Sequence, residues 1–374
     1  MKKYVYADNA ATTKMDQIAY EAMTPYLLEE YANASQLYAF SRNPKKVLNE
    51  AREIIASCIG ALPEEIYFTS GGTESDNWAI KSSVYYDDKK EQTITSTIEH
   101  HAVLNTCSAI ERLGYPVTYI EPSKEGVIIP QSLCQVMTKQ TRLTSIMFAN
   151  NEIGTIQPIK ELCRIAHERG SLFHTDAVQA VGHVEINVED LGVDLLSASA
   201  HKFNGMKGCG FLYIRKGCHL FPYIDGGAQE FGLRAGTENI AGIVSMASAL
   251  KNNCDKIKGN TKKVLKLEKT LLDFLLKEGI VFKRNGGINT LPGLISLSFP
   301  NANGEAILHR LDLMGICIST GSACNSKDTK VSHVLQAIQL DDNYAKGTIR
   351  ISFGKYNTID DANAIGKALA KVLK

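Results

Sequence analysis

Short apolar segments alternate with segments of helical periodicity over roughly the first 250 residues, and this alternation restricts the fold more than any other feature. The candidate strands are 65–70, 93–97, 117–121, 143–149, 171–176, 193–199 and 210–215. Candidate helices include 44–60 and 158–170, and the second ends on Gly170, a residue type favoured directly after a helix. Strands separated by helices predict an α/β fold with a mainly parallel sheet covered by helices.

The sequence changes in character after Asn239, where charged residues join a longer helical pattern. The elements expected from there on are one or two helices in 239–278, a strand at 293–299, a helix at 304–315, a strand at 347–353 and a last helix from Asp360. We therefore expect a large cofactor-binding domain at 15–255, with a seven-stranded sheet, and a smaller α+β domain formed by 1–14 and 256–374.

Composition excludes several classes of protein. The 374 residues carry a net charge of +1, which gives no field that would attract nucleic acid or an anionic membrane. No apolar stretch is long enough to span a bilayer, and the start of the chain lacks the apolar core of a signal peptide. The nine cysteines are odd in number and form no C-x-x-C pair, which disfavours a disulfide framework or a zinc site. We expect a cytoplasmic protein without a metal ion, a membrane or direct nucleic-acid contact.

A phosphate-binding turn is indicated by FTSGGTESDN at 68–77, where an expected strand meets an expected helix. Gly71 and Gly72 allow the backbone to approach an anion, and a helix that begins near Thr73 would attract it. The segment matches neither the Walker A motif nor G-x-G-x-x-G, and an ordinary capped helix start explains it equally well.

An acidic residue follows the strand in FHTDAVQA at 173–180. Asp176 stands at the strand end, where open α/β sheets bind ligands, and a carboxylate there can hold a cationic ring nitrogen. Gln179 would face the same way if a helical turn begins there. A helix N-cap is the simpler alternative for Asp176.

The segment SASAHKFNGMKG at 197–208 places His201 and Lys202 directly after an apolar strand, among small residues. A lysine near a phosphate turn and a carboxylate suits a Schiff base to pyridoxal phosphate. Partial burial lowers the pKa of a lysine amine and makes the amine a better nucleophile. Lys207 is the rival anchor, but its glycine-rich loop predicts a solvated side chain.

Two further motifs carry reactive side chains. His100 and His101 in STIEHHAVLN are neighbours at a strand end, where one ring could stack on an aromatic cofactor. Cys324 lies in ISTGSACNSKDTK, a composition typical of an exposed loop, and we expect a mobile segment at 322–330. A thiol that solvent reaches is a candidate nucleophile, whereas most other cysteines are expected to be buried apolar residues.

Together these motifs resemble the NifS/IscS-like cysteine desulfurases, which are fold-type I pyridoxal-phosphate enzymes. The resemblance runs from YADNAATT (6–13) to TIRISFGKYNT (348–358). Seven motifs occur in family order: FTSGGTESDN, EHHAVLNT, NNEIGTIQPI, HTDAVQAVG, SASAHKFNGMKG, RAGTEN and STGSACNS. The resemblance implies a homodimer that uses pyridoxal phosphate to convert L-cysteine to alanine and an enzyme-bound persulfide. A protein acceptor, such as an iron–sulfur scaffold or a tRNA-thiolation enzyme, would then take the sulfur.

The resemblance also implies a role for individual residues. Lys202 matches the lysine that binds the cofactor, Asp176 the partner of its ring nitrogen, and His100 the histidine that stacks on the ring and helps proton transfer. The other matched cofactor ligands are Gly72, Thr73, Ser199 and His201 at the phosphate, Asn151 and Gln179 near the phenolic oxygen, and Thr237 from the other subunit. Arg350 matches the arginine that grips the substrate carboxylate, and Cys324 matches the cysteine that attacks the substrate sulfur.

The chain departs from the family pattern in two places. Asn33 stands in ANASQLY where many relatives carry N-P-[AS]-S, and it is expected to touch the substrate carboxylate although the proline is missing. The sequence ends at Lys374, without the tail that many bacterial housekeeping relatives use to dock a scaffold, and we expect weaker scaffold binding.

Other functions remain open at this point. Selenocysteine lyase or cysteine sulfinate desulfinase activity would use the same cofactor and fold. A non-catalytic binding module would be expected to lack Lys202 or Cys324, and a simple aminotransferase would have no use for an exposed Cys324. The combination of the two residues favours the cysteine desulfurase.

Overall fold

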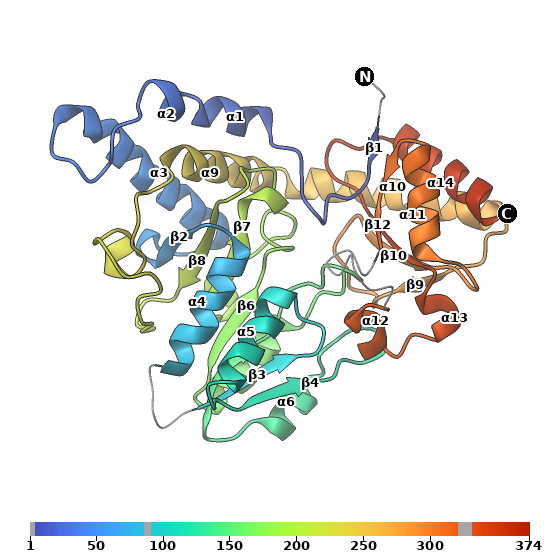
Figure 1. Cartoon of the computed structure of the whole chain (residues 1–374), viewed down its shortest axis with the longest axis horizontal. Coiled ribbons are helices and arrows are strands. Elements are labelled where there is room, and N and C mark those ends of the chain that lie inside the picture. Colours follow the sequence, from blue (N-terminus) through green and yellow to red (C-terminus); the bar gives the residue numbers. More distant parts are fainter. Residues whose placement is uncertain (1–3, 86–90, 321–330) are drawn as a thin grey trace.

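The computed structural model describes residues 4–85, 91–320 and 331–374 (Figure 1). Its main feature is a seven-stranded sheet in the order β2 (Ile66–Thr69), β8 (Gly210–Ile214), β7 (Leu195–Ser199), β6 (Leu172–Asp176), β5 (Thr141–Ser145), β3 (Gln92–Ser96) and β4 (Val117–Ile120). β8 runs antiparallel to both of its neighbours, and the remaining neighbours are parallel. The predicted α/β class with a mainly parallel seven-stranded sheet is therefore confirmed.

Helices cover both faces of this sheet. The helices on one face are α3 (Arg42–Ile59), α6 (Pro130–Val136), α7 (Ile159–Glu168) and α9 (Ile240–Cys254), and those on the other are α4 (Gly72–Tyr85) and α5 (His101–Glu111). Leu195 packs with the α4 and α5 side, whereas Leu196 packs with the opposite side. Successive residues of a strand face opposite ways, so a continuous apolar strand serves both layers.

Short helices extend these layers at three places. They are α1 (Gln17–Met23) and α2 (Pro25–Leu28), both before α3, and α8 (Val188–Leu191), which leads into β7. α7 ends close to its predicted limit, and Gly170 follows with a φ of 70°, as its residue type predicts.

A second, antiparallel sheet has the order β12 (Ser319–Thr320), β13 (Thr348–Ser352), β10 (Leu294–Ser298) and β9 (Lys283–Asn285). The helices around it are α10 (Ile257–Lys277), α11 (Gly304–Leu313) and α14 (Ile359–Leu373), with the short α12 (His333–Ala337) and α13 (Asp342–Ala345) nearby. Their apolar faces form a core of their own, which includes Leu271, Leu297, Ile351 and Leu369. The helices and strands expected after residue 239 are present, and β9, β11 (Ile316–Cys317) and β12 are additional strands.

The N-terminus joins this second half of the chain. β1 (Val5–Tyr6) pairs in parallel with β11 (Ile316–Cys317), and Figure 1 shows it beside the orange and red elements. The chain then continues to α1 in the first half. Division into domains at 15–255 and at 1–14 with 256–374 stays a prediction.

One expectation about local structure was wrong. The strand predicted at 143–149 ends at Ser145. On the side that faces β3, the Met147 amide donates to the Glu99 carboxylate, whereas the Ile146 and Phe148 amides still donate to His174 and Asp176 next to them. The chain makes a helical turn directly after Asp176, as the interpretation of Gln179 requires, because the Val181 amide donates to the Ala177 carbonyl at 2.9 Å. In the part of the chain that the structure describes, no helix is both long and apolar enough to span a membrane.

Candidate active site

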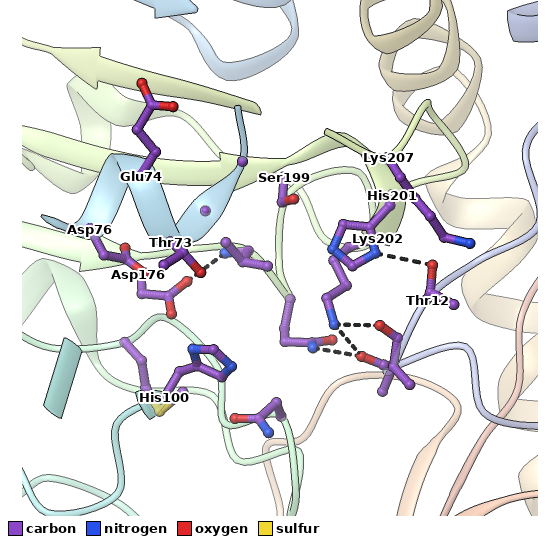
Figure 2. A pocket seen from close by; sticks show the side chains of 18 of the residues that line it. Thr12, Thr73, Glu74, Asp76, His100, Asp176, Ser199, His201, Lys202 and Lys207 are labelled. Atoms are coloured by element: carbon purple, nitrogen blue, oxygen red, sulfur yellow. Dashed lines mark hydrogen bonds between the residues drawn. The ribbon is translucent and has the colours of Figure 1, made fainter. Parts of the chain in front are cut away.

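A cavity of about 620 Å³ opens where β6 and β7 end and α4 begins (Figure 2). Ligands of open α/β sheets bind at this edge, and the volume lies within the range of small-molecule sites. The predicted site residues that line the cavity are Gly72, Thr73, His100, Asn151, Asp176, Gln179, Ser199, His201, Lys202 and Arg350. Residues far apart in the sequence therefore converge on one place.

One end of the cavity is built for an anion. Gly72 is the first residue of α4, and Thr73, Ser199 and His201 line the space next to this helix N-terminus. A Cβ atom on Gly72 would lie 2.5 Å from Cγ2 of Val178, so only glycine allows this close approach. Burial, followed by the charges of nearby lysines, lowers the pKa of His201 to about 4. The donor set of hydroxyls, imidazole and helix amides suits a phosphate.

Asp176 lies at the end of β6, and its Oδ1 accepts a hydrogen bond from the Val178 amide at 2.9 Å. Burial raises its pKa, and the nearby charges of His100 and Lys202 act in the opposite direction. A buried carboxylate can hold a protonated ring nitrogen, because the low polarity around it strengthens the attraction.

His100 caps the N-terminus of α5. Its Nδ1 accepts the Ala102 amide at 3.1 Å, so the neutral ring carries its proton on Nε2. Burial lowers the pKa of His100, which favours this neutral form. His100 can therefore donate a proton or a hydrogen bond from Nε2. His101 is the first residue of α5, and its ring lies 5.0 Å from that of His333.

Lys202 follows β7 in a short 3₁₀ turn, and its side chain reaches the N-terminal segment. The Nζ atom donates to the carbonyl oxygens of Ala10 at 2.6 Å and Ala11 at 2.8 Å (Figure 2). Gln179 donates to the same Ala10 carbonyl at 3.0 Å. Lys207, the rival anchor, is exposed as predicted, although it also borders the cavity.

Arg350 comes from the middle of β13 and is only 5% exposed. Its Nη2 donates to Oδ1 of Asp8 at 2.8 Å, and its Nη1 donates to the Asn151 carbonyl at 2.9 Å. Nε is buried and has no hydrogen-bond partner among the described residues. The guanidinium is held at Nη1 and Nη2, and its Nε–H group remains for a carboxylate ligand.

Two predicted residues lie outside the cavity lining, and a third is not among the described residues. Thr237 is exposed and does not border the cavity of its own chain. Asn33 also lies outside the cavity lining, where its Oδ1 accepts the Ser35 amide at 2.9 Å. Cys324 and the loop expected at 322–330 lie outside the described residues.

Several lining residues were missed. Asp76 on α4 is buried, and Oδ1 lies 3.6 Å from Nε2 of His174. The Thr12 hydroxyl and Nδ1 of His201 share a hydrogen bond of 3.1 Å. The carbonyls of Ala10 and Ala11 carry no side-chain signal, and only their place in YADNAATT could have drawn attention to them.

The site fits pyridoxal phosphate. Gly72, Thr73, Ser199 and His201 would hold the phosphate, Asp176 the ring nitrogen, and Lys202 the aldehyde carbon. This set combines an anion cradle, a buried carboxylate and an amine within one cavity. Glycine at position 72 keeps this space open, because a Cβ atom there would displace Val178.

Comparison with known proteins identifies the class. The chain matches the aminotransferase class-V family over residues 5–365. It is 46% identical to "Cysteine desulfurase IscS" of Dictyoglomus turgidum over 380 residues, covering 100% of this chain and 95% of that protein. It is also 46% identical to the protein of the same name from Methanosarcina thermophila, covering 100% and 92%.

Solved structures agree with this result. A "NifS-like protein" superposes with a TM-score of 0.94 at 38% identity, covering 99% of both chains. A structure described as "SspA in complex with cysteine" superposes with a TM-score of 0.85 at 37% identity, covering 94% of this chain and 99% of that one.

The chain therefore belongs to the aminotransferase class-V family of fold-type I pyridoxal-phosphate enzymes. Within that family it is a cysteine desulfurase of the NifS/IscS-like group. The predicted family, fold and cofactor are thereby confirmed.

Proposed function

We propose that this chain removes sulfur from L-cysteine to give L-alanine and a persulfide on Cys324. The observation that carries the proposal is the convergence of Lys202, Asp176 and Arg350 on one cavity, because these are an anchoring base, a ring partner and a carboxylate ligand. Bound pyridoxal phosphate would supply an electron sink that weakens bonds at the substrate α-carbon.

Each of four residues of the chain has its own role in the reaction. Arg350 binds the α-carboxylate and sets the orientation of the substrate. Lys202 takes the α-proton, and Asp176 stabilises positive charge on the ring nitrogen. His100 donates from Nε2 toward the substrate, since its Nδ1 is occupied by the Ala102 amide. All four residues line the cavity.

Cys324 carries the sulfur in this proposal. Its thiolate attacks the substrate sulfur, so that an S–S bond forms and the C–S bond breaks. One proton is then added to the carbon that becomes the alanine methyl group, and another restores the α C–H bond. L-Cysteine and the Cys324 thiol are together converted to L-alanine and a persulfide, without an external oxidant or reductant. A protein acceptor in the cytoplasm then receives the outer sulfur.

We further propose a homodimer in which Thr237 completes the phosphate site of the other subunit. Thr237 is exposed and lies away from its own cavity, as this role requires. Asn33 is assigned to the substrate carboxylate on family resemblance alone. The large domain at 15–255 would carry the cofactor, and the smaller one would carry Arg350 and Cys324.

The function is tested by incubating the purified holoenzyme with L-cysteine and a reducing thiol. Sulfide and alanine are expected in equal amounts. Pyruvate with ammonia in place of alanine would identify a lyase of a different kind and would overturn the proposal.

A further inference from the structure

Residues 8–13 form a short segment that touches both halves of the proposed site. On one side, the Asn9 backbone amide donates to the carbonyl of Ser352, two residues after Arg350, and Asp8 pairs with Arg350 itself. On the other side, the carbonyls of Ala10 and Ala11 accept the Lys202 amine. The segment thus connects the strand that carries Arg350 with the turn that carries Lys202.

The pair of Asp8 and Arg350 is largely removed from water. The side chain of Arg350 is 6% exposed and that of Asp8 is 19% exposed, and their N–O distance is 2.8 Å. A guanidinium buried to this degree needs a nearby negative charge, because an unpaired buried charge is costly. Asp8 supplies that charge from a backbone that is itself tied to Ser352.

The bonding pattern leaves Arg350 ready for a second carboxylate. Of its five N–H groups, one is donated to Asp8 and one to the Asn151 carbonyl. Nε–H is buried without a partner among the described residues, and Arg350 borders the cavity. A carboxylate that binds there would meet a guanidinium plane already held at both terminal nitrogens.

A second buried acid near the guanidinium does not replace Asp8. Burial raises the pKa of Glu152 to about 7, and the Ser332 hydroxyl and the positive charge of Arg350 act in the opposite direction. The Glu152 carboxyl accepts its hydrogen bond from Ser332, at 2.5 Å. Asp8 is therefore the acid that forms an ion pair with Arg350.

We propose that Asp8 is a positioning residue that holds the Arg350 guanidinium in the orientation that receives the substrate carboxylate. This inference rests on the proposed role of Arg350. It assigns to Asp8 an effect on carboxylate recognition, separate from any effect on cofactor binding or on sulfur chemistry.

The test compares two ligands that differ by the carboxylate and contain no sulfur. L-Alanine and ethylamine are titrated into the holoenzyme, and binding is followed by the visible absorbance of the bound cofactor, so turnover plays no part. Asp8→Asn should weaken L-alanine binding by about tenfold or more, because a charge-assisted contact is lost, and leave ethylamine binding unchanged. Asp8→Glu, which keeps the charge, should recover part of the preference for L-alanine.

Two controls separate the outcomes. Asn9→Ala removes contacts of the neighbouring residue to Ser352 and Asn357, and should change both ligands equally if at all. Arg350→Lys should abolish most of the preference for L-alanine. If Arg350→Lys leaves the preference intact, the proposed role of Arg350 fails, and the inference about Asp8 fails with it.

If only Arg350→Lys lowers the preference, the role of Arg350 stands and that of Asp8 is overturned. Equal losses for both ligands in Asp8→Asn would show a purely structural role for Asp8. Tighter binding of L-alanine by Asp8→Asn would show that Asp8 competes with the substrate carboxylate. Either result would overturn the inference.

Discussion

The amine of Lys202 lies 2.6 Å from the carbonyl oxygen of Ala10, although the two residues are 192 positions apart in the sequence. The contact holds the N-terminal segment against the cavity, where Thr12 and Lys202 both line it (Figure 2). An ammonium group has three donors, so the backbone can hold this amine in place whenever it is not bonded to the cofactor. The anchor therefore has a defined resting position.

Lys202 should be the only lysine that anchors the cofactor. Lys202→Ala is expected to fold and to lose the visible absorbance of covalently bound pyridoxal phosphate, because the amine that forms the bond is gone. Lys207→Ala is the matched control and should keep the absorbance, since Lys207 is exposed. Absorbance spectra after dialysis give the answer, and the reverse pattern would make Lys207 the anchor.

Gly72→Ala should weaken cofactor binding. The added Cβ would lie 2.5 Å from Cγ2 of Val178, and relief of such overpacking typically costs about 1–3 kcal/mol. Adding Val178→Ala should restore much of the affinity, because it removes the clashing atom. Titration of the apoenzyme with pyridoxal phosphate measures the four variants of this double-mutant cycle. Additive effects would show that contact with Val178 is not the cause.

Glu152 should make the protein less stable as the pH rises. Burial raises its pKa from 4.5 to about 7, so between these values the folded chain keeps a proton that the unfolded chain has lost. The free energy of unfolding must then fall as the pH rises through this window. Glu152→Gln cannot lose a proton, and it should gain stability relative to the wild type between pH 4.5 and about pH 7. Urea unfolding of both apoproteins at several pH values tests this, and parallel curves would contradict it.

Thr237 should act on the other subunit. In a hybrid of Lys202→Ala and Thr237→Ala chains, one site would carry both defects and the other would be fully native. The hybrid should therefore recover activity that neither mutant homodimer has. If Thr237 served its own chain, each site would keep one defect and no activity would return. Co-expression with two affinity tags isolates the hybrid, and sedimentation of an active monomer would also contradict the prediction.

The fold was predictable because the pattern of apolar segments is strong and local. Phe173 and Leu196 lie in apolar runs at strand length, and both are fully buried in the sheet. The end of β5 was not predictable in this way. On the side that faces β3, the Glu99 carboxylate accepts the Met147 amide from 48 positions away. Propensity carries no information about a side chain that replaces a ladder hydrogen bond.

The candidate site was likewise predictable only in part. Asp176 and Lys202 follow strands, so the rule for open sheets was enough to bring them together. The role of Ala10 and Ala11 lies in their carbonyl oxygens, which every residue type has. Asp8 was missed because its partner Arg350 is 342 positions away, and only the tertiary structure makes them neighbours.

The most direct test of the account is product formation by Cys324→Ser, with Cys317→Ser as the control. Cys317 is the nearest preceding cysteine, and burial raises the pKa of its thiol, so its loss should matter little. Both variants receive L-cysteine and, separately, cysteine sulfinate, whose leaving group needs no thiol attack. Cys324→Ser should release no sulfide or alanine from L-cysteine while still releasing alanine from cysteine sulfinate. Full sulfide release by Cys324→Ser would contradict the account.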